Sequence, residues 1–459
     1  MLSLSLVACI GVSVLETLTL EKIDHISGSV KLIGSKSLTN RALLLSALSE
    51  GRTKLTNILR SDDSKVMIQA LKQLGVKVEE NEQDPTEVII TGLGGVFNTQ
   101  EQGTIEMFLG NAGTAMRPLA AALALSNGTY KLTGEDRMYE RPIGILVDAL
   151  RKLGAKIEYL GNEGYPPLLI TGRKALENNN TNQANTYELE VAGNTSSQFI
   201  SALLMVGSLL DKPMNLKVKG ELISKPYVNL TCELLKRFGI QVANNDYVSF
   251  TINPQALISP NHYLVEGDAS GATYFLAAAA IRGSVKVYGV GKDSIQGDAK
   301  FIEVLSQMGA NIEIGDDYLA VSQAQELKGI DIDMNDMPDA AMTLVPMALF
   351  TKEPIIIRNI ESWRVKETDR IAALATEMRK LGCQVEEGQD YIKVQATGDN
   401  YQKIKEQGTL IGFDTYNDHR MAMSMSLAAL DRSIIINDPM CCKKTFPDYF
   451  ERLALVSVR

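Results

Sequence analysis

One helix-ending pattern recurs along this chain of 459 residues. It reads Leu-x-x-Leu-Gly or a close variant with Phe or Met at an apolar position, and its copies stand at 71–75, 150–154, 235–239, 305–309 and 378–382. A glycine directly after the last apolar position is typical of a left-handed helix stop. The five glycines are 70 to 85 residues apart, and a degenerate sixth copy at 450–455 has Ala454 instead of glycine. This spacing predicts six copies of one unit of about 75 residues.

Each unit also contains an earlier helix that is rich in small residues. Six such helices are predicted to begin near Ser37, Thr114, Ser197, Ser270, Ala340 and Arg420. Short alternating segments such as Lys54–Leu59 and Ser284–Tyr288 predict strands between the helices. Each unit is therefore expected to be a βαβαββ repeat of an α/β protein. Ordinary helix ends, which any α/β protein has, would not each be paired with a second kind of helix.

The sixth unit lacks the strands that should follow its second helix, and the segment 16–33 looks like those missing strands. The chain is thus expected to close on itself and to form two domains of three repeats each. We expect residues 1–14 to be an extension outside the fold, 15–34 plus 267–459 to form one discontinuous domain, and 35–266 to form the other. The active site is expected in the cleft between the two domains.

The composition limits the possible partners. Hydrophobic residues make up 45% and charged residues 22%, as in globular proteins. A net charge of −9 argues against nucleic acid or an anionic membrane as partner. Three histidines and five scattered cysteines without a C-x-x-C pair predict neither a disulfide framework nor a metal site. The first basic residue, Lys22, follows the apolar N-terminal stretch, so we expect no secretory signal and a cytoplasmic location.

Polar residues are concentrated where the first helix of each unit begins. Helix N-termini carry unpaired N–H groups and a partial positive charge, and they attract phosphate and carboxylate groups. Mobile cationic side chains are expected beside these helix starts at Lys36, Arg41, Arg117 and Arg420, and a second basic set precedes the second helices at Arg137, Arg141, Lys225, Lys366, Arg370 and Lys444. Any one of these is readily explained as a helix cap with a solvated basic neighbour. Together, in an acidic protein, they predict a polyanionic small molecule as ligand.

Acid–base candidates are few. Asp339 begins a helix in a largely apolar segment, so its pKa is expected to rise. Glu367 lies in a dense charge cluster after Trp363, which a salt-bridged helix start would also explain. His419 stands beside the cationic Arg420, which favours a neutral, hydrogen-bonding imidazole. Covalent catalysis is not indicated, because no nucleophile is paired with a base.

Several longer motifs are recognisable together: GSKSLTNRALLLSAL, LGNAGTAMRPLAAAL, ERPIG, SSQF, SKPY, VEGDASGATYFLAAAA, PDAAMT, WRVKETDR, YNDHRMAM and KTFPDYFERLA. From about Glu16 to the C-terminus the chain resembles the EPSP synthase (3-phosphoshikimate 1-carboxyvinyltransferase) family. The resemblance implies a two-domain inside-out α/β barrel fold with three βαβαββ repeats per domain. It also implies transfer of the enolpyruvyl group of phosphoenolpyruvate to the 5-hydroxyl of shikimate 3-phosphate, which yields 5-enolpyruvylshikimate 3-phosphate and phosphate. This reaction belongs to the shikimate pathway to chorismate and the aromatic amino acids.

The resemblance implies roles for individual residues. The implied contacts to shikimate 3-phosphate are Lys36, Ser37, Arg41, Ser196, Ser197, Gln198, Ser224, Tyr227, Asp339, Ser362 and Lys366. The implied contacts to phosphoenolpyruvate are Lys36, Gly113, Thr114, Arg141, Gln198, Arg370, His419, Arg420 and Lys444. Asp339 corresponds to the base for the hydroxyl, Glu367 to the proton donor and acceptor at the methylene carbon, and Lys36 touches both substrates. Neither a metal nor a cofactor is implied, and Ser362 stands where the family often has Asn.

Two other functions stay open. UDP-N-acetylglucosamine enolpyruvyl transferase shares the fold and phosphoenolpyruvate, but its loop cysteine has no equivalent at 137–141. A phosphometabolite-binding protein without turnover would not need carboxylates beside its cations. The resemblance also suggests a monomer, and Gly113-Thr114 with Pro118 matches the family's glyphosate-sensitive pattern. Glyphosate is therefore an expected inhibitor, competitive with phosphoenolpyruvate.

Overall fold

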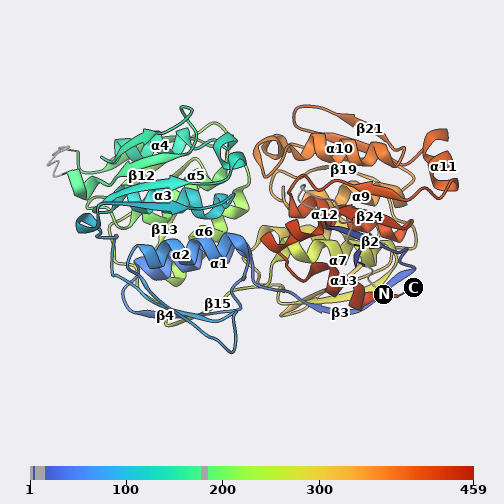
Figure 1. Ribbon diagram of the computed structural model, residues 1–459, viewed down its shortest axis with the longest axis horizontal. Helices are drawn as coiled ribbons and strands as arrows, with labels where there is room; N and C mark the ends of the chain where they lie inside the picture. The colour runs from blue at the N-terminus through green and yellow to red at the C-terminus, as the bar shows by residue number, and fades with distance from the viewer. Residues whose placement is uncertain (1–3, 6–15, 177–183, 459) are drawn as a thin grey trace. The chain divides into compact units, whose positions relative to one another are not determined.

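A computed structural model of the chain describes residues 4–5, 16–176 and 184–458. The chain divides into two compact units (Figure 1). Unit 1 consists of the N-terminal segment up to Ile33 together with Gly267–Arg459, and unit 2 is Gly34–Glu266. Gly34, which the sequence analysis assigned to the discontinuous domain, belongs to unit 2. Its neighbour Ser35 donates a backbone hydrogen bond to Glu266 of the same unit.

Unit 2 contains three four-stranded sheets with one common strand order. In each sheet a parallel pair is extended by two antiparallel strands, as in the order β7-β8-β10-β9. The elements of this sheet's repeat are β7 (Thr104–Phe108), α3 (Gly113–Leu125), β8 (Thr129–Thr133), α4 (Gly144–Lys152), β9 (Lys156–Tyr159) and β10 (Leu168–Thr171). The next repeat consists of β11 (Tyr187–Ala192), α5 (Ser197–Gly207), β12 (Met214–Lys219), α6 (Lys225–Arg237), β13 (Val242–Asn245) and β14 (Ser249–Ile252). Both repeats have the predicted order βαβαββ.

The first repeat of unit 2 takes one strand from the far end of the unit. Its local elements are α1 (Lys36–Leu48), β4 (Arg52–Thr56), α2 (Asp62–Gln73), β5 (Lys77–Glu80) and β6 (Val88–Thr91). The missing strand is β15 (His262–Leu264), which pairs with β4 in parallel. About 200 residues therefore separate two neighbouring strands of one sheet, and no local sequence pattern predicts this pairing.

Unit 1 repeats the same plan three times. The fourth repeat of the chain consists of β3 (His25–Lys31), α7 (Ala269–Ile281), β16 (Gly283–Tyr288), α8 (Phe301–Gln307), β17 (Asn311–Ile314) and β18 (Tyr318–Ser322). The fifth repeat consists of β19 (Ile330–Asp333), α9 (Leu344–Met347), β20 (Ile355–Arg358), α10 (Arg370–Lys380), β21 (Gln384–Glu387) and β22 (Ile392–Gln395). After α11 (Asp399–Glu406), the sixth repeat consists of β23 (Ile411–Phe413), α12 (His419–Met425), β24 (Ile434–Asn437) and α13 (Tyr449–Val456). Short 3₁₀ turns join these elements.

The N-terminal segment serves two different sheets. Strand β2 (Thr17–Leu20) pairs with β24 and completes the sixth sheet, as the sequence predicted. Strand β3, expected in the same sheet, instead pairs in parallel with β16 and is the first strand of the fourth repeat. Of residues 1–14 the structure describes only β1 (Leu4–Ser5), which pairs with β2, so the expectation that this stretch lies outside the fold does not hold for that pair. The rest of the stretch lies outside the described residues.

The helix stops follow the sequence pattern at five of six positions. Gly75, Gly154, Gly239, Gly309 and Gly382 all have positive φ, from 79° to 103°. At the sixth position the prediction is wrong, because α13 continues through Ala454 to Val456. Alanine has no preference for the left-handed conformation, so the helix runs on into β25 (Ser457–Val458), which pairs with β3.

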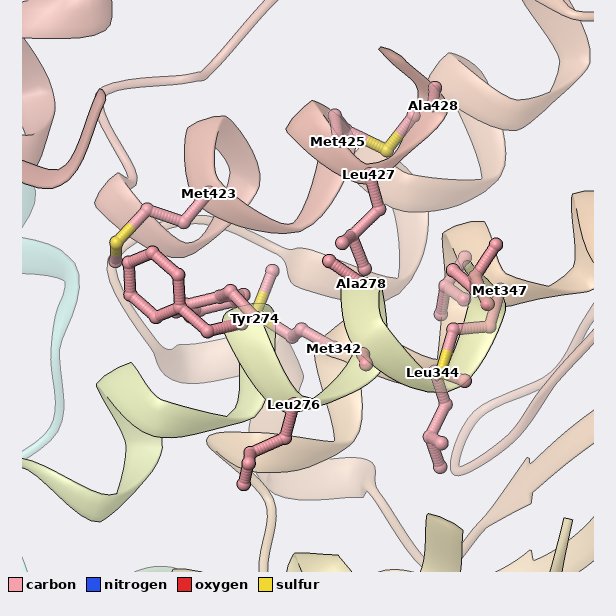
Figure 2. Close-up of a cluster of buried hydrophobic side chains, with 14 of the residues drawn as sticks. Tyr274, Leu276, Ala278, Met342, Leu344, Met347, Met423, Met425, Leu427 and Ala428 are labelled. Atoms are coloured by element: carbon pink, nitrogen blue, oxygen red, sulfur yellow. The ribbon is translucent and has the colours of Figure 1, made fainter. Parts of the chain in front are cut away.

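The small-residue helices form the interior of each unit. All thirteen residues of α7 are buried, and Figure 2 shows Tyr274 of this helix beside Met423 of α12. Strands alternate between buried and exposed residues, as in β4 and β8, so each sheet turns one face outward. Helices inside and sheets outside give the inside-out architecture, with three repeats in each unit. In the described part of the chain, no helix has the length and apolar character needed to cross a membrane.

Candidate functional site

Asp339 of unit 1 lies within 3.4 Å of three cationic side chains. It precedes the 3₁₀ turn Ala340–Thr343. Its Oδ1 lies 2.9 Å from Nη1 of Arg370 and 3.4 Å from Nζ of Lys366, and its Oδ2 lies 3.0 Å from Nη2 of Arg420. Lys366 and Arg370 come from the start of α10 and the residues just before it, and Arg420 comes from α12, so tertiary packing assembles the cluster.

The expected rise in the pKa of Asp339 is wrong. Burial is the largest single influence and raises the pKa, but Arg420, Lys366 and Arg370 together outweigh it. The pKa of Asp339 is therefore held well below its ordinary value. The pKa of Lys366 is also lowered from its ordinary value. Burial is the largest cause, and the positive charge of Arg370 adds to it, while the negative charge of Asp339 raises the pKa.

Arg370, the first residue of α10, links three carboxylates. Besides Asp339, its Nε donates to Oδ2 of Asp418 at 2.8 Å and its Nη2 to Oε2 of Glu367 at 3.1 Å. Burial alone would lower the pKa of Arg370, but the three carboxylates raise it well above its ordinary value. Glu367 is also 3.5 Å from Nζ of Lys444. The predicted residues Asp339, Glu367, Arg370 and Lys444 therefore belong to one connected ion-pair network.

Arg420 and His419 begin α12 in the buried part of this network. The Asp418 side chain caps the helix by accepting from the backbone N–H of Arg420 at 2.9 Å. Nη1 of Arg420 donates to the Tyr274 hydroxyl at 3.4 Å. His419 is fully buried, with Nδ1 at 3.7 Å from Oδ1 of Asp418.

The segment that carries Asp339 is anchored by the single tryptophan. Nε1 of the fully buried Trp363 donates to the backbone carbonyl of Pro338 at 2.6 Å. The half-buried Ser362 precedes Trp363 in the same 3₁₀ turn, Glu361–Val365. The indole therefore ties the turn that holds Ser362 to the residue before Asp339.

Another buried carboxyl group, that of Asp298, lies near Asp339. Asp298 accepts a hydrogen bond from the Ser270 hydroxyl at the start of α7. Burial, and after it the negative charge of Asp339, raises the pKa of Asp298 to about 7. This residue was not among the predicted site residues.

In unit 2 the start of α1 carries two of the predicted cations. Nζ of Lys36, the first residue of the helix, lies 3.5 Å from Oδ2 of Asp63. Arg41 donates from Nε to the Thr231 hydroxyl at 2.9 Å and from Nη1 to the carbonyl of Ser37 at 3.0 Å. Burial lowers the pKa of Arg41 to about 10, which leaves it cationic at neutral pH.

The start of α3 has two guanidinium groups beside a glycine. A Cβ on Gly113 would lie 2.5 Å from Nη1 of Arg117 and 2.8 Å from Nη2 of Arg141. Nη1 of Arg141 donates to the carbonyl and to Oδ1 of Asn111, at 2.9 and 2.8 Å. The Thr114 hydroxyl accepts from Nδ2 of Asn40 at 2.8 Å, which joins α3 to α1.

The predicted serines lie at two further helix starts of unit 2. Ser196 caps α5 by accepting from the backbone N–H of Gln198 at 3.3 Å, and Ser197 is buried. Ser224 precedes α6 in the left-handed conformation, with φ 55°, and its carbonyl accepts from the backbone N–H of Tyr227. Contacts of α3 with α5, α5 with α6 and α1 with α6 bring these helices together in the unit.

Part of the sequence-based interpretation is wrong. The cations expected to be mobile, Lys36, Arg41, Arg117 and Arg420, are at most 9% exposed and held by protein partners. Arg137 and Lys225, which the sequence grouped with the site cations, pair with Glu140 and Glu221 and are more exposed.

Sequence reasoning missed the residues that hold the predicted ones in place: Asp63, Asn111, Thr231, Tyr274, Asp298 and Asp418. Asn111, Tyr274 and Asp418 carried a signal, since they stand in the quoted motifs LGNAGTAMRPLAAAL, VEGDASGATYFLAAAA and YNDHRMAM. The other three make their contacts through tertiary packing.

Taken by itself, each unit holds buried cations beside helix N-termini. Such groups bind phosphate and carboxylate, and unit 1 adds two carboxylates, Asp339 and Glu367, within reach of the same cations. In the described ranges, no three His, Cys, Asp or Glu side chains gather as a metal site would require. The chemistry favoured by this arrangement is proton transfer on a polyanionic substrate.

Comparisons with known proteins agree with this chemistry. The sequence model of the EPSP synthase (3-phosphoshikimate 1-carboxyvinyltransferase) family matches residues 20–453. The chain is 54% identical over 447 residues to 3-phosphoshikimate 1-carboxyvinyltransferase of Vibrio atlanticus, which covers 97% of this chain and 100% of the relative. It is also 54% identical over 438 residues to the enzyme of that name from Shewanella halifaxensis, covering 95% and 98%.

Solved structures share the fold at low sequence identity. EPSP synthase from Acinetobacter baumannii is similar with a TM-score of 0.75 and 23% identity, over 96% of this chain and 98% of that one. The enolpyruvyl transferase NikO from Streptomyces tendae is similar with a TM-score of 0.73 and 15% identity, over 96% and 97%. With the family match over almost the whole sequence and relatives above half identical, the chain belongs to the EPSP synthase family.

Proposed function

We propose that this chain transfers the enolpyruvyl group of phosphoenolpyruvate to the 5-hydroxyl of shikimate 3-phosphate and releases phosphate. The observation that carries the proposal is the buried network of unit 1, in which Asp339 and Glu367 share Arg370 as an ion-pair partner. Reversible proton transfer at two different atoms of the reacting pair needs two acid–base groups, which the two carboxyl groups supply, and the surrounding cations suit two polyanionic substrates. The family membership supports the same reaction.

In the proposed addition step, Asp339 takes the proton of the 5-hydroxyl while the oxygen of that hydroxyl forms a bond to C2 of phosphoenolpyruvate. Glu367 donates a proton to C3, so that the methylene becomes a methyl group in a tetrahedral intermediate. In the elimination step, Glu367 takes one proton back from that methyl group, the C2–O bond to phosphate breaks, and the proton on Asp339 leaves with the phosphate or through solvent. The product is the enol ether, and the carboxyl groups return to their starting states.

The low pKa of Asp339 has a role in this scheme. In the free chain, where the three cations pair with it, the Asp339 carboxylate is a weak base. Anionic substrates that bind Lys366, Arg370 and Arg420 draw part of that positive charge away, which raises the basicity of Asp339 when both substrates are bound. The base is thereby activated in the complex.

The proposal assigns the unit 2 residues to binding. Lys36, Ser37, Arg41, Ser196, Ser197, Gln198, Ser224 and Tyr227 are proposed to contact shikimate 3-phosphate, along with Ser362 and Lys366 of unit 1. Lys36, Gly113, Thr114, Arg141 and Gln198 are proposed to contact phosphoenolpyruvate, along with Arg370, His419, Arg420 and Lys444 of unit 1. The support is that several of these residues lie at the starts of α1, α3, α5, α10 and α12 beside buried cations, a geometry that suits phosphate and carboxylate. Glyphosate is the proposed inhibitor at the phosphoenolpyruvate site.

The test is phosphate release from phosphoenolpyruvate with shikimate 3-phosphate or with UDP-N-acetylglucosamine as acceptor. We expect release with the shikimate ester alone, and loss of that release in Asp339→Asn. The matched control is Asp336→Asn, an exposed aspartate three positions earlier. Phosphate release with UDP-N-acetylglucosamine would show instead the activity of UDP-N-acetylglucosamine enolpyruvyl transferase. Tight binding of the substrates without phosphate release would identify a binding protein without turnover.

A cytoplasmic location and a monomeric state belong to the same proposal. The four cysteines in the described ranges are free thiols, and three of them are buried, which suits a reducing compartment. Light scattering of the purified chain tests the monomer: a mass of one chain is expected, and a mass of two would contradict it.

A further inference from the structure

The strongest unassigned feature near the proposed substrate contacts is a buried ion pair in unit 2. Nζ of Lys36 lies 3.5 Å from Oδ2 of Asp63, with side-chain exposures of 11% and 5%. Lys36 is the first residue of α1, and Asp63 is the second residue of α2. The pair therefore joins the starts of two packed helices.

The two residues stand in opposite electrostatic positions. The N-terminus of a helix carries partial positive charge, which disfavours a cation such as Lys36 and favours a carboxylate such as Asp63. A buried ammonium also needs a counter-charge, because removing it from water costs several kcal/mol. Asp63 supplies that charge from the place in α2 where a carboxylate is most favourable.

Asp63 is not needed to cap its own helix. The capping box of α2 is made by two serines: Ser61 accepts from the backbone N–H of Ser64, and the Ser64 hydroxyl accepts from that of Ser61 at 2.9 Å. Its neighbour Asp62 points to the surface and pairs with Lys65. The carboxylate of Asp63 is therefore used for Lys36.

Other charged side chains on the elements that pack against α1 are directed elsewhere. Arg41 bonds to Thr231, and Arg117 of α3 donates to the carbonyl of Pro142. On β4 and α6 the charged pairs are Arg52 with Glu79, Lys54 with Glu87, and Lys225 with Glu221. Among the described residues, Asp63 is the carboxylate that the Lys36 ammonium contacts.

We propose that Asp63 is the positioning residue of Lys36, which holds the ammonium at the start of α1 until anionic substrate groups replace the carboxylate as its partner. This rests on the proposed function only for the identity of the anions; the holding itself is a property of the free chain. A fixed ammonium contributes to catalysis through alignment, and a competing carboxylate limits how tightly the anion binds.

The first test measures the freedom of Lys36 without turnover. The whole chain is acetylated briefly with acetic anhydride at one fixed pH, and mass spectrometry of the digest gives the labelling rate of Lys36 relative to the exposed Lys152. We expect Asp63→Asn to raise that ratio several-fold, with Asp62→Asn leaving it at the wild-type value. An unchanged ratio in Asp63→Asn would overturn the proposal, and general unfolding would raise both lysines together.

The second test separates positioning from structure. In Asp63→Asn we expect kcat to fall about tenfold while KM for shikimate 3-phosphate stays level or falls, since the competing charge is gone. Asp63→Glu, which restores the charge on a longer arm, should bring the labelling ratio and kcat back toward wild type. A rise in KM at constant kcat in Asp63→Asn, or no rescue by Glu, would contradict the proposal. If the wild type shows no turnover, the labelling experiment still decides the role of Asp63.

Discussion

Nη2 of Arg420 lies 3.0 Å from Oδ2 of Asp339, although the two residues are 81 positions apart in the chain. The same guanidinium reaches the Tyr274 hydroxyl, and its own backbone N–H is bound by the side chain of Asp418. One arginine therefore connects the proposed base to the start of α12 and to the buried helix α7. Several predictions of activity and stability depend on contacts of this kind.

Arg420→Lys tests the arginine geometry. Lysine keeps the charge but not two donors in a fixed plane, so it cannot hold Asp339 and Tyr274 together. A charge-assisted hydrogen bond is worth about 1.5–3 kcal/mol, and we expect kcat/KM for phosphoenolpyruvate to fall roughly 10- to 100-fold. The steady-state assay should show no such loss for Arg358→Lys, whose side chain pairs with Asp331 on the surface.

Gly113→Ala tests the anion site at the start of α3. The new methyl group would meet Nη1 of Arg117 at 2.5 Å and Nη2 of Arg141 at 2.8 Å, and both are ends of flexible side chains that can shift. We expect a folded protein whose inhibition constant for glyphosate rises roughly tenfold or more, since overpacking costs about 1–3 kcal/mol. Inhibition assays against Gly161→Ala, whose methyl would make an ordinary 3.4 Å contact with Pro167, provide the comparison. Equal inhibition of the two variants would refute a glyphosate site at Gly113.

Asp298→Asn tests the pH dependence of stability. The pKa of this buried carboxyl is raised from 3.8 to about 7. The folded chain then keeps a proton that the unfolded chain releases, so the free energy of unfolding falls as pH rises from about 4 to 7. Asparagine removes this penalty and can still accept from Ser270. We expect thermal unfolding to show a variant stabilised by up to about 4 kcal/mol at pH 8 and unaltered below pH 4.

The control for that experiment is Asp293→Asn, an exposed residue of the same connection. It should follow the wild-type curve at every pH. A wild-type-like pH profile in Asp298→Asn would show that Asp298 is ionised in the folded chain.

Trp363→Phe tests the anchor of the Asp339 segment. The substitution removes the Nε1 donor from the carbonyl of Pro338 and leaves a cavity where the larger ring was. We expect the free energy of unfolding in urea, followed by circular dichroism, to fall by about 2–4 kcal/mol. Because Asp339 follows Pro338 directly, kcat should fall as well. Unchanged stability would mean that the indole is not an anchor.

Local patterns predicted much of the architecture. Glycine at 75, 154, 239, 309 and 382 stops its helix with positive φ because it lacks a Cβ, and that preference is local. Five of the six small-residue helices begin within one residue of the predicted positions, at Lys36, Gly113, Ser197, Ala269 and His419. In the fifth unit a 3₁₀ turn begins at the predicted Ala340, and the α-helix begins at Leu344. Family motifs then led to the residues that unit 1 gathers around Asp339.

The sequence by itself determined the repeat, the five glycine helix stops and the charged residues at the helix starts, because these depend on backbone preferences and on spacing of a few residues. Only the tertiary structure decided that β3 pairs with β16 and β15 with β4, since either strand fits any open sheet edge of matching polarity. The tertiary structure also decided the pKa of Asp339. The apolar local sequence would raise this pKa, but three cations that are distant in the sequence and close in space lower it. Electrostatic interactions depend on distance in space, and these distances are set by packing between repeats.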